Sequence, residues 1–327
     1  MGTRPVRRLA RRCCKGECMT AKNNPLTTVF IGAVEGSARA LQALCEAGMA
    51  PDLVVTLPLA KADSHSDFAD LAPIASEHGI ALRRVPRTDD ADLVQELRGL
   101  NPDLILIIGW SQLVGREMLD LPRLGVIGFH PAPLPKMRGR AVIPWQILTA
   151  QRQAGATLFW IDEGVDDGPI AAQSVFDIDP ETIDARGLYD LSVNEMARLL
   201  PDLVGQLANG ERPATPQDHA QASICARRRP EDGEIDWTRS ADEIERLIRA
   251  VGPPYPGATT RSAKGATVTV TRARRHPREG YFIGMPGQVQ DVAPDAVTVM
   301  CGDGRCIDLL EWNGPEKLGR HTILGRT

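Results

Sequence analysis

Short apolar runs alternate with amphipathic stretches through the first part of the chain. Four apolar runs predict buried strands, at Thr28–Ala33, Asp52–Leu57, Ala81–Val85 and Asp103–Ile108. Stretches with helical spacing follow the first three strands, at Ser37–Ala47, Phe68–His78 and Asp90–Leu100. Strands without a polar face are typical of a parallel sheet that is covered by helices on both sides. The pattern therefore predicts an α/β fold with a doubly wound, mostly parallel sheet.

The pattern changes after residue 208. Residues 209–225 are polar and contain glycine, proline, aspartate and histidine, which is typical of a linker. A helix is expected next, and then short β-like runs between turn residues, at Ser240–Val251, Thr267–Thr271, Gly287–Val289, Ala296–Met300 and Cys306–Leu310. Short strands at such spacing predict a small, OB-like β-barrel. We expect a catalytic domain over residues 26–208, a linker over 209–225 and a C-terminal barrel domain over 226–327.

Charge is distributed unevenly along the chain, which has 327 residues and a net charge of −4. Seven basic residues and one glutamate give the first 22 residues a charge of +6, so the rest of the chain carries −10. An acidic body is a weak electrostatic match for nucleic acid. We interpret residues 1–25 as a disordered or artefactual extension, with translation starting at Met19. No apolar run is long enough for a transmembrane helix, and we expect a cytoplasmic protein.

The seven cysteines do not indicate a metal site. Cys13, Cys14 and Cys18 lie close together, but no second pair of cysteines or histidines stands near them to complete a zinc site. The other four cysteines are scattered, as expected for reduced, mostly structural thiols in a cytoplasmic protein.

A proline-rich loop that begins at His130 is the first candidate for chemistry. A strand expected over Val126–Phe129 runs into His130, and three prolines stiffen the loop that follows, because proline fixes φ and removes a donor. Ligands bind at the carboxyl ends of strands in open α/β sheets, which is where His130 is expected. The alternative is a structural histidine in a proline-rich turn.

An acidic turn supplies the second candidate. Residues 162–170 read DEGVDDGPI, in which Gly164 and Gly168 flank Asp166. Such a turn is either a solvated surface loop or a means of presenting one carboxylate to a neighbouring strand end. A carboxylate beside a histidine orients the imidazole and raises its pKa. His130 and Asp166 are therefore a candidate general acid–base pair.

These segments together resemble the folate-dependent formyltransferase family, whose members act on methionyl-tRNA, glycinamide ribonucleotide or nucleotide-linked amino sugars. The loop is similar to the family pattern N-x-H-P-S-x-L-P-x-x-R-G at Phe129-His130-Pro131, Leu134-Pro135 and Arg138-Gly139. Residues 164–168, GVDDG, are similar to the family turn G-[VLM]-D-x-G. Two later segments also resemble the family, Arg229–Trp237 and Pro254–Ala258, so the resemblance extends toward the C-terminus.

The resemblance implies a site for each substrate and no metal. It implies that His130 and Asp166 are catalytic and that formyl-tetrahydrofolate is the co-substrate. The folate would lie against the loop after the fourth strand and against the acidic turn, at Gly109, Trp110, Ser111, Gln112, Leu113, Val114, Asp162, Gly164 and Val165. The acceptor amine would contact residues of the proline-rich loop, at Pro133, Lys136, Arg138, Gly139 and Arg140.

One position departs from the family pattern. The family triad is Asn, His, Asp, and the position of the asparagine is Gly128 in this chain. Loss of such an oxyanion donor typically costs about 10²–10³ in rate. Three alternatives stay open: Ser111 or Gln112 replaces the donor, the acceptor is a more nucleophilic hydroxylamine, or the protein binds folate without transferring formyl. We expect the substitution Gly128→Asn to raise activity if the scaffold is otherwise intact.

Two features bear on the acceptor. Methionyl-tRNA formyltransferases carry a basic loop after the second strand, but residues 58–68 of this chain contain one lysine, Lys61, and no arginine. The segment Pro254–Ala258 is more similar to the sugar N-formyltransferases. We therefore expect a small amine, with a nucleotide-linked amino sugar first and a hydroxylated ornithine-type amine next. Transfer RNA is the runner-up.

Overall fold

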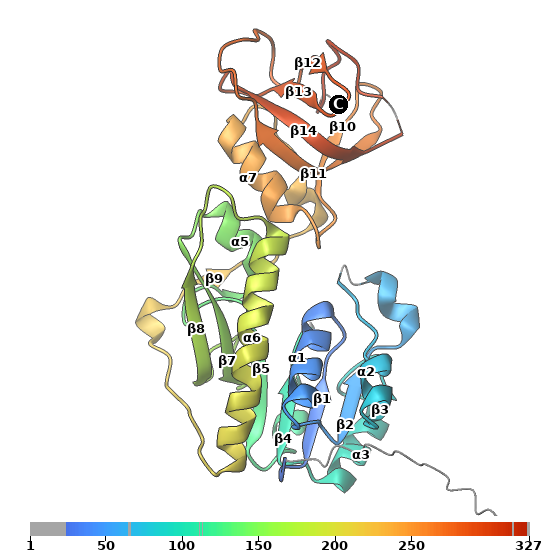
Figure 1. Cartoon of the computed structure of the whole chain (residues 1–327), viewed down its shortest axis with the longest axis vertical. Coiled ribbons are helices and arrows are strands. Elements are labelled where there is room, and N and C mark those ends of the chain that lie inside the picture. Colours follow the sequence, from blue (N-terminus) through green and yellow to red (C-terminus); the bar gives the residue numbers. More distant parts are fainter. Residues whose placement is uncertain (1–23, 65–66, 111, 113, 316, 326–327) are drawn as a thin grey trace, which may run out of the picture.

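A seven-stranded sheet forms the first domain (Figure 1). The computed structural model describes residues 24–64, 67–110, 112, 114–315 and 317–325. The predictions for the first 23 residues, and those for Ser111 and Leu113, fall outside this part of the chain. The strand order is β3-β2-β1-β4-β5-β7-β8. The strands are β1 (Thr28–Ile31), β2 (Leu53–Thr56), β3 (Ala81–Arg84), β4 (Leu104–Ile107), β5 (Gly125–His130), β7 (Gln153–Trp160) and β8 (Ile170–Asp177).

The first five strands are parallel, and β7 and β8 are antiparallel to their neighbours. Helices cover both faces, as the alternation along β4 shows. Leu104 and Leu106 pack with helices α1 and α6, whereas Ile105 and Ile107 pack with α3 and α4. The helices of this domain are α1 (Glu35–Glu46), α2 (Ala72–Glu77), α3 (Ala91–Leu100), α4 (Arg116–Leu119), α5 (Val142–Leu148) and α6 (Ala185–Ala208). The predicted doubly wound, mostly parallel α/β fold is confirmed.

Helix α2 is shorter than the sequence pattern predicts. The helix was expected from Phe68, but Phe68 forms an antiparallel β-bridge with Val34, and the amide of Ala69 donates to the carbonyl of Ala33. The helix begins only after Asp70, whose carboxylate accepts from the amide of Ala72. A tertiary pairing with the start of α1 therefore overrides the local helical pattern.

The C-terminal domain is a five-stranded antiparallel sheet with one long helix against it. Helix α7 (Ala241–Val251) begins in a capping box, in which Ser240 and Glu243 satisfy each other's backbone amides. The strand order is β10-β11-β14-β13-β12. The strands are β10 (Ala258–Arg261), β11 (Thr267–Arg275), β12 (Val289–Val292), β13 (Val297–Met300) and β14 (Cys306–Asn313). The predicted C-terminal domain, a helix followed by short strands, is confirmed, and its antiparallel sheet is consistent with a small barrel.

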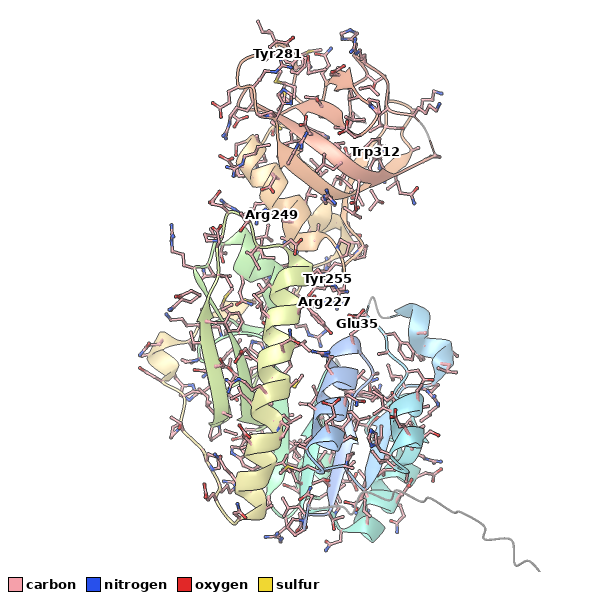
Figure 2. All side chains as sticks on the ribbon, in the orientation of Figure 1. Glu35, Arg227, Arg249, Tyr255, Tyr281 and Trp312 are labelled. Atoms are coloured by element: carbon pink, nitrogen blue, oxygen red, sulfur yellow. The ribbon has the colours of Figure 1, made fainter. Side chains whose placement is uncertain are left out.

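A shared apolar core joins the two domains end to end (Figure 1). Ile143 and Ile147 of α5 belong to the same buried cluster as Ile244 and Ile248 of α7. Polar contacts reinforce the junction around Arg249, which lies where α7 meets the first domain (Figure 2). Its guanidinium donates to the carbonyls of Pro180 and Ile183 and pairs with Glu245.

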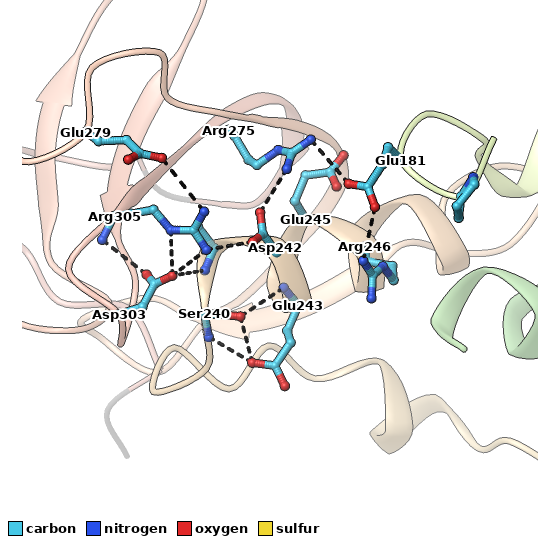
Figure 3. Close-up of polar contacts among 12 residues, drawn as sticks. Glu181, Ser240, Asp242, Glu243, Glu245, Arg246, Arg275, Glu279, Asp303 and Arg305 are labelled. Carbon is cyan, nitrogen blue, oxygen red and sulfur yellow. Dashed lines mark hydrogen bonds and ion pairs between the residues drawn. The ribbon is translucent and has the colours of Figure 1, made fainter. Parts of the chain in front are cut away.

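Glu181 adds an ionic contact at the same junction (Figure 3). Its carboxylate lies 3.7 Å from Arg246 of α7 and 3.5 Å from Arg275 of β11. The loop between β8 and α6 is thus held by ion pairs to α7 and to β11 of the C-terminal domain. No helix within the described ranges is both long enough and apolar enough to cross a membrane.

The stretch predicted as a linker lies along the first domain and is hydrogen bonded to it. Thr215 forms a β-bridge with Ile170 at the start of β8. Further on, β9 (Ile224–Cys225) pairs in parallel with β6 (Arg138–Gly139), which belongs to the proline-rich loop. The chain between α6 and the C-terminal domain therefore contacts the segment that carries the candidate chemistry.

Candidate active site

The proline-rich loop after β5 is fixed by side chains of the neighbouring elements. The hydroxyl of Thr157 on β7 donates to the carbonyl of Ala132, and the amide of Gln173 on β8 donates to the carbonyl of Leu134. Gln146 of α5 donates to the carbonyl of Pro131. Proline has no N–H, so this loop cannot form a regular strand or helix. The three side chains instead satisfy backbone carbonyls of the loop.

The acidic turn has a shape that its glycines permit. A Cβ on Gly168 would lie 1.8 Å from the carbonyl oxygen of Trp160, and a Cβ on Gly164 would lie 2.0 Å from the carboxylate of Asp167. Asp166 itself has a φ of 49°, in the left-handed region that aspartate tolerates better than most residues. The turn is therefore tight, and its backbone aims Asp166 toward the end of β5.

His130 and Asp166 are brought together by these two segments. Nδ1 of His130 lies 3.5 Å from Oδ2 of Asp166, and the same carboxylate oxygen accepts from the amide of Gly139 at 2.8 Å. Nε2 of His130 lies 2.7 Å from the carbonyl oxygen of Met137. A carbonyl can only accept, so Nε2 carries the ring proton and Nδ1 presents a lone pair.

This arrangement leaves Nδ1 of His130 able to accept a proton. The side chain is buried, and burial lowers the pKa of His130, which Asp166 and the Met137 carbonyl oppose only in part. The resting ring is therefore neutral. When Nδ1 takes up a proton, the imidazolium that forms lies beside the Asp166 carboxylate. For the candidate acid–base role that the sequence indicates, this geometry suits His130 to relay a proton.

A cavity of about 800 Å³ opens in front of the pair. This volume is within the range of small-molecule sites. The predicted residues that line it are Gly109, Trp110, Gln112, Val114, His130, Gly139, Arg140, Asp162, Gly164, Val165 and Asp166. The structure thus brings the loop after β4, the end of β5 and the acidic turn to one cavity. The first two meet because parallel strands end at the same edge of the sheet, whereas the acidic turn follows the antiparallel strand β7.

Three predicted acceptor contacts do not line this cavity. Pro133 packs against the backbone of β7, where a Cβ on Gly155 would lie 2.8 Å from it. Lys136 borders a separate, smaller cavity. Arg138 is 6% exposed and its guanidinium is bonded to Gln217 and His219. The structure corrects the interpretation of Arg138 as an acceptor-binding cation, because its donors are turned into the protein.

Two residues with side-chain donors in the loop after β4, Trp110 and Gln112, line the cavity. The amide nitrogen of Gln112, one of the two proposed replacements, donates to the carbonyl of Pro86 at 2.8 Å. The indole nitrogen of Trp110 is buried at the cavity wall and has no hydrogen-bond partner within the described part of the chain. A buried donor without a partner is costly unless a ligand satisfies it. Trp110 is therefore a donor that the cavity offers to a bound molecule.

Gly128 is enclosed by apolar side chains. A Cβ at this position would lie 2.9 Å from Cγ1 of Ile161 and 3.1 Å from Cε1 of Phe159. A larger side chain here requires Ile161 to move, so Gly128→Asn alone does not leave the scaffold intact, which is the condition on which the expected gain in activity rests.

The opposite wall contains residues that the sequence patterns did not single out. The hydroxyl of Tyr189 on α6 donates to Asp67 and accepts from the amide of Gly36 at the start of α1. All three residues line the cavity. Tyr189 and Asp67 are 122 residues apart in the chain, so no local motif connects them. In the described ranges, no three His, Cys, Asp or Glu side chains are grouped to hold a metal ion.

Comparison with known proteins places these features in a family. Residues 53–203 match the formyl transferase family model, and residues 228–320 match the model of the formyl transferase C-terminal domain. The methionyl-tRNA formyltransferase of Agathobacter rectalis is 32% identical over 85% of this chain and 89% of its own length. That of Chloroflexus aggregans is 34% identical over 71% of this chain and 75% of its own length.

Two solved structures share the fold. HypX from Aquifex aeolicus in complex with tetrahydrofolic acid has a TM-score of 0.64 at 18% identity, over 91% of this chain and 45% of HypX. The N-formyltransferase from Helicobacter canadensis, solved with folinic acid and dTDP-3-aminofucose, has a TM-score of 0.62 at 18% identity, over 87% of this chain and 99% of that protein. The chain, with both its N-terminal and its C-terminal domain, belongs to the formyltransferase family.

Proposed function

We propose that this formyltransferase moves the formyl group of formyl-tetrahydrofolate to the primary amine or hydroxylamine of a small acceptor, with a nucleotide-linked amino sugar as the first candidate. The observation that carries the proposal is the pairing of buried His130 with half-buried Asp166 at the wall of a cavity large enough for a folate head group and an amine. Folates bound to two proteins of the same fold support the choice of donor.

The residues present supply a complete proton path. The acceptor nitrogen attacks the formyl carbon, and its proton passes to Nδ1 of His130 while Asp166 stabilises the imidazolium. The bond between the formyl carbon and the folate nitrogen then breaks, and the same proton is returned to that nitrogen. General acid–base assistance of this kind contributes about 10²–10⁴ in rate. The products are a formamide and tetrahydrofolate.

A small acceptor is supported by the distribution of charge. In the C-terminal sheet, three arginines that could meet a nucleic-acid backbone are paired with carboxylates: Arg272 with Glu311, Arg274 with Asp308 and Arg275 with Asp242. The 3₁₀ turn after β2, Leu59–Ser64, carries Lys61 as its one basic residue. Phosphate binding relies on unpaired cations, which these surfaces do not concentrate.

Methionyl-tRNA is the second candidate acceptor, because the curated relatives at about 30% identity carry that activity in their names. A panel of amines decides between the two. Purified protein is mixed with formyl-tetrahydrofolate and, in turn, an amino sugar nucleotide, an N-hydroxylated ornithine and methionyl-tRNA, and tetrahydrofolate release is followed. The proposal predicts release with a small amine. Release with methionyl-tRNA alone, weakening steeply with salt, would establish the second candidate.

The third candidate function is folate binding alone, by a homologue that no longer transfers the formyl group. Measurable folate binding without tetrahydrofolate release for any amine in the panel would support that reading and contradict the proposed function.

A further inference from the structure

Gln217 lies between the two catalytic segments, although it belongs to the stretch that follows α6. Its side chain is buried, with the residue 6% exposed. The bridge between Thr215 and Ile170 holds the chain just before it, and the pairing of β9 with β6 holds the chain after it. A glutamine in a polar stretch is ordinarily solvated, so this burial needs a physical reason.

The carboxamide of Gln217 makes four hydrogen bonds. Oε1 accepts from Nε and Nη2 of Arg138 at 3.0 and 2.7 Å. Nε2 donates to the carbonyls of Asp166 and Gly168 at 2.9 and 2.7 Å. Arginine can only donate and a carbonyl can only accept, so the orientation of the amide is unambiguous. Two acceptor and two donor positions are all used.

Each end of this amide leads to one member of the catalytic pair. Arg138 directly follows Met137, whose carbonyl fixes the Nε2–H tautomer of His130. On the other side, the carbonyl of Asp166 is held while its backbone stays at a φ of 49°. Gln217 is therefore the bridge that sets the loop of His130 and the turn of Asp166 at a fixed separation.

We propose that Gln217 is a positioning residue for formyl transfer, which holds His130 and Asp166 in register from outside the cavity. The proposal rests on the roles of His130 and Asp166 in the proposed function. A displacement of about 1 Å in a catalytic group can cost on the order of 100-fold in rate. Loss of the bridge is expected to lower kcat by about 10- to 100-fold. The folate KM is expected to change less than kcat, since Gln217 bonds the backbone of the acidic turn but leaves the loop after β4 untouched.

Two substitutions distinguish a positioning role of Gln217 from an effect on the stability of the fold alone. Gln217→Ala removes all four hydrogen bonds. Gln217→Glu keeps the contact with Arg138 as an ion pair but sets a carboxylate oxygen against the carbonyls of Asp166 and Gly168. Because the ion pair with Arg138 is retained, we expect Gln217→Glu to keep a Tm closer to that of the wild type than Gln217→Ala does, and still to lose kcat. Gln221→Ala is the matched control, because this exposed glutamine of the same stretch bonds only Asp218.

The measurement is kcat and KM for formyl-tetrahydrofolate with a working amine, together with Tm, for these variants and for His130→Ala. A fall in kcat that exceeds any change in KM in both Gln217 variants, with Gln221→Ala unaffected, supports positioning. Wild-type kcat in Gln217→Glu, or kcat and KM changing only in step with Tm, overturns it. If His130→Ala keeps its turnover, the proposed function fails together with the positioning role. If His130→Ala is inactive but both Gln217 variants are fully active, only the positioning role is overturned.

Discussion

The side chain of Ile161 occupies the space beside Gly128 in which a carboxamide would have to begin. Cγ1 of Ile161 would be 2.9 Å from a Cβ on Gly128, which is closer than side-chain carbons come in folded proteins. The glycine and the isoleucine are thus complementary in volume. The absence of the family's asparagine is built into the packing at the cavity wall rather than being an isolated replacement.

This pairing changes the expected outcome of Gly128→Asn. Overpacking of this kind typically costs about 1–3 kcal/mol of stability, so the single variant should lose stability without gaining turnover. The double variant Gly128→Asn/Ile161→Ala provides room and should exceed the single variant in kcat. Ile161→Ala alone is the control, and urea unfolding with tetrahydrofolate release measures both effects. An increase in turnover by Gly128→Asn alone at unchanged stability would contradict the packing account.

Trp110 should contribute a hydrogen bond to the bound folate or formyl group. The substitution Trp110→Phe keeps an aromatic surface but removes the unpaired indole N–H. A neutral hydrogen bond contributes about 0.5–1.5 kcal/mol, so the KM for formyl-tetrahydrofolate should rise about 2- to 10-fold. Trp145→Phe is the matched control, because its indole donates to the carbonyl of Ala226 outside the main cavity. Equal effects of the two substitutions on KM would argue against this role.

The pH dependence of kcat/KM should report the neutral form of His130. Burial lowers the pKa of His130 below its ordinary value of 6.5, so the acidic limb should lie below pH 6.5. Asp166→Asn removes a charge that raises this pKa and should move the limb to lower pH. A limb above pH 6.5 in the wild type would identify a different base.

The same lowered pKa also affects stability. Below pH 6.5 the unfolded chain binds a proton more readily than folded His130 does, so His130 stabilises the fold above that pH. This contribution is lost as the pH falls through the lower, folded pKa. His130→Gln removes the titrating group, so its urea midpoint should fall less than that of the wild type on acidification from pH 7.

The junction between the domains should depend on Arg249. Arg249 and Glu245 are each 11% exposed at the side chain, and Arg249→Met leaves that glutamate without its partner. Breaking a buried pair costs about 3–5 kcal/mol. The control is Arg239→Met, since Arg239 also pairs four residues away along the chain, with Glu243, but is 64% exposed. That pair should contribute about 0–1 kcal/mol. Equal losses in the free energy of unfolding would mean that burial does not determine the effect.

Local patterns were sufficient for the five parallel strands of the sheet and insufficient for one long helix. The residues of β4 are apolar on both faces, which predicts its place inside the sheet. Helix α6 begins at a clear N-cap, Asp184, but Pro201 and the buried Ser192 interrupt its apolar spacing. Its length of 24 residues is maintained by packing on α1 and on the sheet, which no local window contains.

The site was predictable where a motif carries it. His130, Asp166 and Gly164 of the acidic turn stand in recognisable patterns, and the structure brings them to one cavity. Arg138 stands in one of the same motifs, but its hydrogen-bond partner Gln217 is 79 residues away along the chain. The inward orientation of the Arg138 side chain could therefore not be inferred from the sequence. The enclosure of Gly128 by Ile161 is likewise a contact between separate strand ends.

The most direct test of the account compares the wild type with His130→Ala in one assay, with folate binding measured beside tetrahydrofolate release in the presence of a working amine. The account predicts that the variant still binds formyl-tetrahydrofolate and that its release rate falls by about 10²–10⁴, the usual contribution of a general acid–base group. Unchanged release by His130→Ala at equal folate occupancy would contradict it.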